Sequence, residues 1–206
     1  MTAGTPGSLQ DLLDSGKNIR ELELNTVEHA AIEDLFLVTE KPVLYVANVD
    51  ESSMHTGNRY SKALQEGVAA EKAEVVLINN SIEAQIAEME DPADKALFMS
   101  EYGMKEPVLN RLIRSTYKLL QLSTYFTAGV QEVRAWTMHK GDTAPQAAGV
   151  IHTDFEKGFI RAEVIGFEDY IACKGEHGAK EAGKMRLEGK DYIVKDGDVM
   201  HFRFNV

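Results

Sequence analysis

The sequence predicts an α/β segment in its first half and an α+β segment in its second half, and three observations support this division. Two short apolar runs, Val43 to Ala47 and Val75 to Ile78, lack alternation, as strands buried on both faces of a parallel sheet do. Apolar residues at helical spacing lie between them. From Leu122 onward, polar and apolar residues alternate instead, which is typical of strands with one solvated face.

The first forty residues predict two short helices. Leu9, Leu12 and Leu13 stand at helical spacing before Ser15-Gly16, a pair that ends a helix. Thr26 with Glu28 predicts the start of a second helix. The apolar face of that second helix would hold Ala30, Ala31, Leu35 and Val38.

Residues 43–120 predict a βαβ unit followed by a pair of helices. The helix of the unit is expected over residues 57–73, and such a crossover between parallel strands is right-handed almost by rule. Asp91-Pro92 and Glu106-Pro107 are typical helix starts. The second helix of the pair carries a short basic stripe, which is expected to be its solvated face rather than a nucleic-acid contact: Arg111, Arg114 and Lys118.

A polar residue follows each apolar run of the βαβ unit. Asn48 ends the first run, at the edge where open α/β sheets bind ligands. On turn chemistry alone, an Asn in this place is more often a turn former. Ser81 is expected to be the N-cap of a helix that begins at Ile82 with Glu83 in its first turn, a role that does not exclude a ligand contact.

The second half predicts strands around one helical region. Residues 133–138 alternate as a half-buried strand, and residues 195–198 predict a hairpin turn between strands at 192–194 and 199–204. Ile151, Phe155 and Phe159 fit one helical face. His152, Asp154 and Glu156 are not expected to form a metal or acid/base cluster, because residues two apart on a helix face away from each other. Asp154 is expected to be a cap or turn residue.

The stretch from Lys41 to Glu51 closely resembles the base-recognition segment of the Obg-like ATPases, the YchF family of P-loop NTPases. Its motif is Asn-x-x-Glu, here Asn48 to Glu51, where GTPases carry Asn-Lys-x-Asp. The resemblance implies ATP rather than GTP, with Asn48 bonding the base edge, Val49 lining the pocket, and Glu51 completing the motif. Ser81-Ile82-Glu83 resembles the last nucleotide-binding loop of the family, although Asn79 and Asn80 depart from its pattern.

The phosphate-binding half of such a site is missing from the sequence. A P-loop reads Gly-x-x-x-x-Gly-Lys-Ser/Thr after a strand and before a helix. Gly178 to Lys184 matches by letter, but Met185 stands where the magnesium-binding hydroxyl belongs, and the segment follows polar residues instead of a strand. The ATP and Mg implied by the family are therefore assigned to its complete form. The chain resembles the C-terminal portion of such an ATPase, and no residue in it is given a catalytic or metal-binding role.

Longer matches in the second half resemble the TGS domain of the same family, a small β-grasp module. The resemblance implies contact with RNA or the ribosome. It divides the chain into a remnant of a helical insert (1–40), the C-terminal part of the nucleotide-binding domain (41–121) and a TGS domain (122–206). The fold class is thus an α/β remnant of a P-loop NTPase domain followed by an α+β β-grasp (TGS) domain. The matched segments are 124–129, 132–137, 143–149, 151–162 and 196–206.

The region from Lys174 to Lys190 is the best candidate for an RNA-facing surface, with a solvated loop as the competing explanation. The residues proposed to face RNA are Lys174, Lys180, Lys184, Arg186 and Lys190. The net charge of −11 argues against a globally basic surface, and no DNA partner is expected.

Composition predicts a cytoplasmic protein without a membrane partner. Of the 206 residues, 44% are hydrophobic, which is enough for real cores. No apolar run reaches membrane-spanning length, and residues 1–7 do not read as a secretory signal. The single cysteine, Cys173, suits a reducing compartment and is interpreted as inert, with a redox-sensitive thiol as the alternative.

Three functions from different classes remain open. The first is an ATP-hydrolysing, ribosome-associated switch (a nucleotide-binding hydrolase of the GTP-binding protein family), to which this chain contributes base recognition. The second is a nucleotide-independent module that binds RNA or the ribosome, and the third is an inactive fragment. Since phosphoryl transfer depends on the P-loop, its lysine and magnesium, the chain alone is expected not to hydrolyse ATP. Residues 122–206 are expected to fold robustly and residues 41–90 to be looser.

Overall fold

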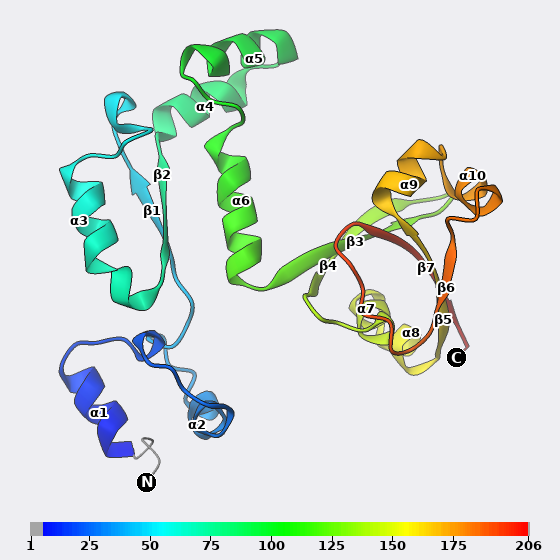
Figure 1. The fold of residues 1–206 in the computed structure, drawn as a ribbon, viewed down its shortest axis with the longest axis horizontal. Coiled ribbons are helices and arrows are strands. Elements are labelled where there is room, and N and C mark those ends of the chain that lie inside the picture. The colour runs from blue at the N-terminus through cyan, green and yellow to red at the C-terminus, as the bar shows by residue number, and fades with distance from the viewer. Residues whose placement is uncertain (1–5, 206) are drawn as a thin grey trace. The chain divides into compact units, whose positions relative to one another are not determined.

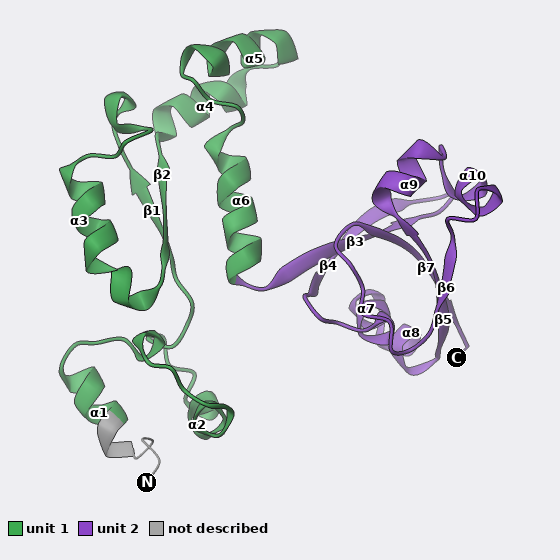
Figure 2. Ribbon diagram, viewed as in Figure 1, with its two compact units in different colours: residues 1–119 green, residues 120–206 purple. Residues whose placement is uncertain are grey.

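The computed structural model describes residues 6–205, and the chain divides into two compact units, residues 1–119 and 120–206 (Figure 2). The ends of the expected first and last domains, residues 1–5 and 206, lie outside the described residues. No helix in the described part of the chain combines the length and apolar character needed to cross a membrane.

The first unit is built around a parallel pair of strands, β1 (Leu44–Asn48) and β2 (Glu74–Ile78), and the parallel pairing is as predicted (Figure 1). The predicted burial on both faces is wrong for β1, because Val46 is 46% exposed. The register aligns Leu44 with Glu74 and Asn48 with Ile78. Helix α3 (Arg59–Gly67) and a 3-10 turn (Ala69–Glu71) connect the strands. This helix is shorter than predicted because Asn58 caps its start, accepting hydrogen bonds from Tyr60 N and Ser61 N.

Five further α-helices precede and follow this strand pair in the described part of the unit. Before it come α1 (Pro6–Asp14) and α2 (Thr26–Ile32); after it come α4 (Asn80–Glu88), α5 (Pro92–Glu101) and α6 (Val108–Leu119). The starts predicted at Asp91-Pro92 and Glu106-Pro107 are confirmed. The helical face predicted to run to Val38 is wrong, because a 3-10 turn follows α2 and Phe36 adopts a left-handed conformation that ends it.

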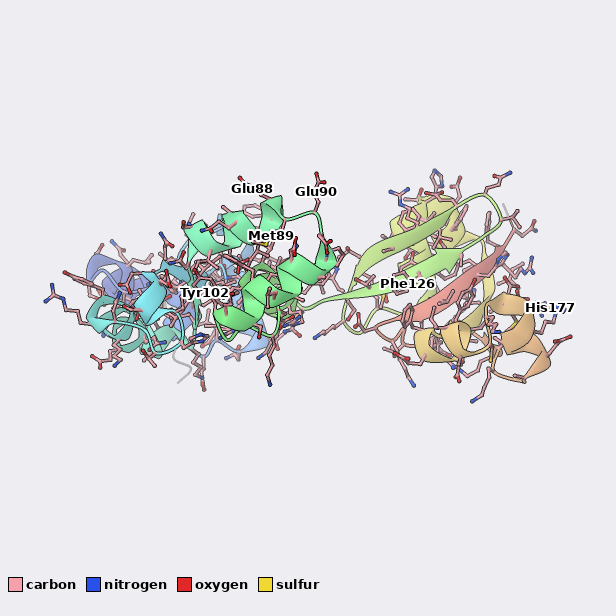
Figure 3. The ribbon with its side chains drawn as sticks, turned by 90° about the horizontal axis from the view of Figure 1, so that it is seen from above. Glu88, Met89, Glu90, Tyr102, Phe126 and His177 are labelled. Atoms are coloured by element: carbon pink, nitrogen blue, oxygen red, sulfur yellow. The ribbon has the colours of Figure 1, made fainter. Side chains whose placement is uncertain are left out.

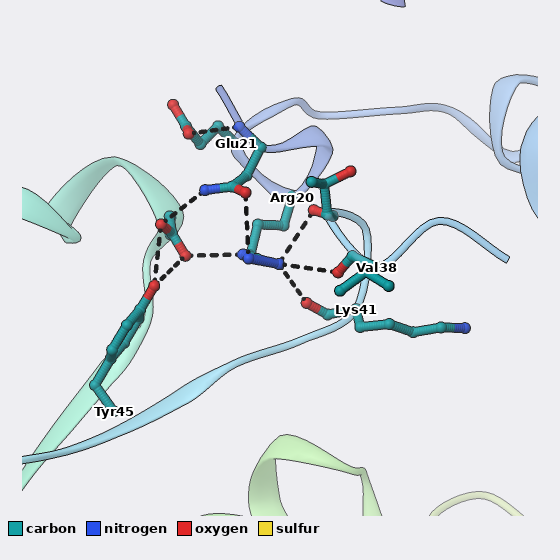
Figure 4. Close-up of polar contacts among 8 residues, drawn as sticks. Arg20, Glu21, Val38, Lys41 and Tyr45 are labelled. Atoms are coloured by element: carbon teal, nitrogen blue, oxygen red, sulfur yellow. Dashed lines mark hydrogen bonds and ion pairs between the residues drawn. The ribbon is translucent and has the colours of Figure 1, made fainter. Parts of the chain in front are cut away.

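One arginine joins the N-terminal segment to the strand pair. The Arg20 guanidinium bonds Glu71 at 2.8 Å and the carbonyl groups of Val38, Thr39 and Lys41, and Tyr45 donates to the same Glu71 carboxylate (Figure 4). Both side chains of the ion pair are largely buried. The loop leading into β1 is therefore held to the chain that leads into β2.

The second unit is a five-stranded mixed sheet in the order β4-β3-β7-β5-β6. Its strands are β3 (Leu122–Ala128), β4 (Val133–His139), β5 (Phe159–Gly166), β6 (Arg186–Glu188) and β7 (Asp198–Phe204). β3 and β4 form a hairpin, β5 lies antiparallel between β7 and β6, and β3 runs parallel to β7. The helices are α7 (Ala144–Ile151), α8 (Thr153–Lys157), α9 (Phe167–Ala172) and α10 (Glu176–Glu181).

The core of the second unit lies between the sheet and α7. Tyr125 is fully buried, and its hydroxyl donates to the carbonyl oxygen of Ala147 at 2.8 Å. Burial raises the pKa of this hydroxyl above its ordinary range. The other core residues are Met138, Ala144, Ala147, Ala148, Phe159, Ala162, Val164, Val194, Met200 and Phe202.

Three local predictions for this unit are wrong. Residues 192–194 form no strand beside β7; only Ile193 makes an isolated bridge, to Thr143, because Val194 N bonds Asp142 O instead. Phe159 opens strand β5 instead of continuing a helix, since α8 ends at Lys157. His152, not Asp154, caps α8, because its Nδ1 accepts from Asp154 N at 3.1 Å.

Candidate functional site

The carboxyl end of the parallel strand pair brings Asn48 and the loop after β2 together. The Asn48 Oδ1 accepts a hydrogen bond from Asn80 N at 3.1 Å. A backbone N–H can only donate, so this bond fixes which end of the carboxamide points toward α4 and leaves the NH₂ group as a donor. Asn48 is exposed, and among the described residues its NH₂ has no partner. A ligand at this edge can therefore receive a hydrogen bond from it.

Val49 and Glu51 occupy different environments in the loop that follows. Val49 is buried, its N–H donates to Ile78 O at 2.8 Å, and its carbonyl accepts from Asn79 Nδ2 at 2.9 Å. Its side chain thus packs inside the unit. Glu51 is exposed and begins a 3-10 turn ending at Ser53. A hydrogen bond from Ser52 to Asp50, at 2.7 Å, holds the pKa of the Asp50 carboxyl below its usual range.

Asn79 is the residue of this edge that the sequence reasoning missed. It is buried, caps α4 by accepting from Ile82 N at 3.0 Å, and donates to Val49 O. One side chain therefore cross-links the loops after both strands. An Asn directly before a helix is a recognised N-cap signal that could have identified it.

Ser81 lies one residue inside α4, so its predicted role as the N-cap of a helix starting at Ile82 is wrong. The helix begins at Asn80 because Asn79 supplies the capping oxygen first. The Ser81 side chain is exposed. Glu83 lies in the first turn, as expected, and also accepts hydrogen bonds from Val108 N and Leu109 N, which ties the start of α6 to α4.

Of the five residues proposed for the basic surface, Lys180 lies on α10 and Arg186 on β6, while Lys174, Lys184 and Lys190 lie in the turns and loop around them. All five are exposed, so the loop explanation still applies to three of them. Lys184 pairs with Asp169 at 3.2 Å, and Arg186 with Glu188 at 3.1 Å. Within the described part of the chain, Lys174, Lys180 and Lys190 have no ion-pair partner. His177 of α10 also points outward, near Glu181 at 3.3 Å (Figure 3).

Arg186 belongs to a structural network. It donates to the Tyr192 hydroxyl at 3.1 Å, and that hydroxyl donates to the buried Asp198 at 2.7 Å. Burial, then the hydrogen bond to Asp198, raises the pKa of Tyr192 to about 12. Asp198 also accepts from Lys195 N at 2.9 Å, within the turn that the sequence predicts at 195–198. The three unpaired lysines are therefore freer than Arg186 to meet a ligand.

The structure also explains the P-loop letter match at residues 178–184 and the group His152, Asp154 and Glu156. The P-loop letter match begins at Gly178 inside α10, where an added Cβ would lie 2.1 Å from Cys173 O, so the glycine serves close packing. The Glu156 side chain packs against Gly149, while His152 approaches Asp154 at 3.4 Å. Across residues 6–205, no three His, Cys, Asp or Glu side chains are grouped to hold a metal ion.

Comparison with known proteins gives long matches. Residues 122–205 match the family model YchF-GTPase_C, described as a protein of unknown function (DUF933). The chain is 58% identical over 194 residues to "Ribosome-binding ATPase YchF" of Escherichia coli O157:H7, covering 94% of this chain and 53% of that protein. The protein of the same name from Bacillus subtilis (strain 168) is 51% identical over 200 residues, covering 96% and 54%. The chain thus spans about half the length of these curated relatives.

A solved structure extends the match to the fold. "Structure of the Schizosaccharomyces pombe YchF GTPase" superposes with a TM-score of 0.81 at 31% sequence identity, over 94% of this chain and 52% of that one. The folds of the two units thus have counterparts in a protein of related sequence.

Proposed function

The chain belongs to the YchF family by homology along nearly its whole length, and from this premise we propose that it supplies the base-recognition loops and the ribosome-contacting module of an ATP-binding switch protein. The observation that carries the proposal is the 58% identity over 194 residues to a ribosome-binding ATPase. We assign residues 41–121 to the nucleotide-binding domain and residues 122–206 to a β-grasp TGS domain. Because ribosomes are cytoplasmic, we assign the protein to the cytoplasm.

The geometry at the carboxyl end of β1 supports base recognition. The Asn48 NH₂ group, oriented by Asn80 N, is a donor suited to an acceptor nitrogen on a purine edge. The buried Val49 side chain anchors the loop after β1 inside the unit, and Glu51 and Ser81 offer exposed polar groups in the loop after β1 and at the start of α4. Phosphoryl transfer depends on the P-loop, its lysine and magnesium, so we assign hydrolysis to the complete family protein.

The second unit supports the assignment to a β-grasp module through its topology. A five-stranded mixed sheet with a parallel central pair, β3 and β7, packs one face on α7. We propose that Lys174, Lys180 and Lys190 meet ribosomal RNA, with Lys184 and Arg186 contributing in part. Residues 174–190 hold five basic and three acidic side chains, a net charge of +2 in a chain of −11.

The first prediction concerns nucleotide binding by the chain itself. In a calorimetric titration with ATP, GTP and adenosine in magnesium buffer, we expect weak binding of ATP and adenosine and weaker binding of GTP. Because the base edge would be the main contact, ATP and adenosine should bind with similar affinity. Asn48→Ala should weaken both by about tenfold, the effect of losing roughly 1.4 kcal/mol. No ATP hydrolysis is expected.

Asn110→Ala, an exposed Asn on α6, is the matched control and should leave binding unchanged. Equal loss in both variants, or preference for GTP, would contradict the base-recognition proposal. If no nucleotide binds at all, the function of this chain reduces to its second unit, the nucleotide-independent alternative.

The second prediction concerns the ribosome. In co-sedimentation with purified ribosomes, the triple variant K174E/K180E/K190E should bind more weakly than the parent chain at every salt concentration. Each lysine that contacts a phosphate contributes roughly one unit to the steepness with which the logarithm of the binding constant decreases with the logarithm of the salt concentration. The triple variant should therefore have a slope that is shallower by about three.

The control K62E/K105E/K140E changes the net charge equally at exposed lysines elsewhere. It should bind nearly as the parent does. If both triple variants lose the same affinity, only net charge is being sensed, and the proposed surface is incorrect.

A further inference from the structure

A groove of about 590 Å³ opens in the second unit where two strands of the sheet separate. β7 pairs with β5 from Asp198 to Phe204, but β3 pairs with β7 only at Phe126 and Val199. One side of the groove is residues 127–132 and the other is residues 200–202 with Phe204. The edge of β7 beyond Met200 therefore faces the groove, without a ladder partner from the described chain.

The floor of the groove is apolar and already ordered. Trp136, Ile151, Phe155 and Phe204 line it, and each is only partly buried. Phe155 stacks on Phe204 with ring centroids 3.8 Å apart, and Trp136 Nε1 donates to Thr127 Oγ1 at 2.9 Å. Because these rings are held in place, a ligand would not bear the cost of ordering them. The volume falls within the range of ligand pockets, roughly 300–1,000 Å³.

The rim adds an apolar contact and little charge. Val130, at the tip of the β3–β4 hairpin, is fully exposed and lines the groove. Among the lining residues, Glu132 is the one carboxylate and there is no lysine or arginine. Arg134 stacks on the Trp136 ring at 4.0 Å, but it also pairs with Glu132 at 3.9 Å. A phosphate backbone would therefore find one cation that is already paired, whereas a main chain would find the N–H and C=O groups of β7.

We propose that this groove receives an extended polypeptide segment, which adds to the free edge of β7 and places an apolar side chain against Trp136 and Phe155. Strand addition to an exposed sheet edge draws affinity from main-chain hydrogen bonds and specificity from pockets for alternate side chains. Both are present here, in the β7 edge and in the aromatic floor. The inference depends on neither nucleotide binding nor the basic surface.

The test uses the full chain and a library of capped, uncharged hexapeptides with Val, Ile, Phe or Tyr at alternate positions and Thr or Ser between them. Trp136 is the single tryptophan and lines the groove, so its fluorescence reports binding directly. The tightest peptide is then N-methylated at alternate amides, first on one edge and then on the other. Methylation of one edge should weaken binding at least about tenfold, and methylation of the other should change it little.

Hydrogen exchange of the bound chain should show new protection at residues 200–204 and not at β6, which is one of the two edge strands of the sheet. Val130→Asp should weaken binding, while Leu187→Asp, an exposed apolar residue on β6, should not. The inference is overturned if no peptide binds up to about 1 mM, if both methylated series bind equally, or if protection appears at β6. Displacement of the peptide by a single-stranded RNA oligonucleotide that occupies the groove more tightly would also overturn it.

Discussion

Arg20→Ala is expected to release the segment before β1 from the rest of the first unit and to destabilise that unit by about 3 kcal/mol or more. Glu71 is largely buried and receives hydrogen bonds from Arg20, Asn18 and Tyr45 (Figure 4). Removing the arginine leaves a carboxylate without its countercharge in a place where water screens it poorly. The carbonyl groups of Val38, Thr39 and Lys41 lose their shared donor as well.

Hydrogen exchange measured by mass spectrometry should report this loss as faster exchange over residues 36–48, by about 100-fold if exchange requires opening of the unit. The single tryptophan lies in the second unit, so the denaturation curve followed by Trp136 fluorescence should remain that of the parent. Arg59→Ala is the control, since Arg59 is an exposed arginine that stacks on Tyr60. Similar exchange in both variants would show that the Arg20 network contributes nothing measurable.

Gly158→Ala is expected to destabilise the second unit by about 3 kcal/mol or more, because no space exists for a methyl group there. An added Cβ would lie 2.0 Å from Asn205 O, a backbone atom. Asn205 N also bonds Gly158 O at 2.9 Å, so the two segments cannot separate without breaking the start of the β5–β7 ladder. The backbone of Gly158 is itself ordinary, with φ of −89°, which makes the expected effect purely steric.

Chemical denaturation followed by Trp136 fluorescence measures this prediction. The midpoint should fall markedly for Gly158→Ala, and the exchange of the first unit should not change. Gly166→Ala, at the far end of β5 from Gly158, is the matched control, since its Cβ would meet nothing within 4 Å and its φ is −66°. If the denaturation midpoint of Gly158→Ala equals that of the control within error, the backbone around Asn205 moves aside at no measurable cost and the predicted clash does not destabilise the unit.

Much of the fold follows from local patterns in the sequence. The unbroken apolar runs at 43–47 and 75–78 predicted the parallel pair β1 and β2, and the alternation at 133–138 predicted β4. The proline-marked starts of α5 and of α6 were also correct within a residue or two. These signals work because periodicity and capping act over a few neighbouring residues. The positions predicted for base and RNA contact remain predictions.

The wrong predictions concern segments that could form more than one local structure. Asn79 and Ser81 were both able to cap α4, and Asn79 took the role because it also reaches Val49 O, 30 residues earlier in the chain. Residues 192–194 looked like a strand, but the bond from Val194 N to Asp142 O diverted them. In each case a contact distant in sequence decided between alternatives of similar local energy.

The sequence by itself determined the order of the elements, the parallel strand pair and the kinship of the chain, since each rests on residues read in succession. Only the tertiary structure decided that Asn48 is oriented by Asn80, that Arg186 belongs to the Tyr192–Asp198 network while three lysines remain unpaired, and that β3 and β7 separate to open a groove. Hydrogen-bond partners and strand divergence depend on how distant segments pack, and the free energies that select them are not encoded in any short window of sequence.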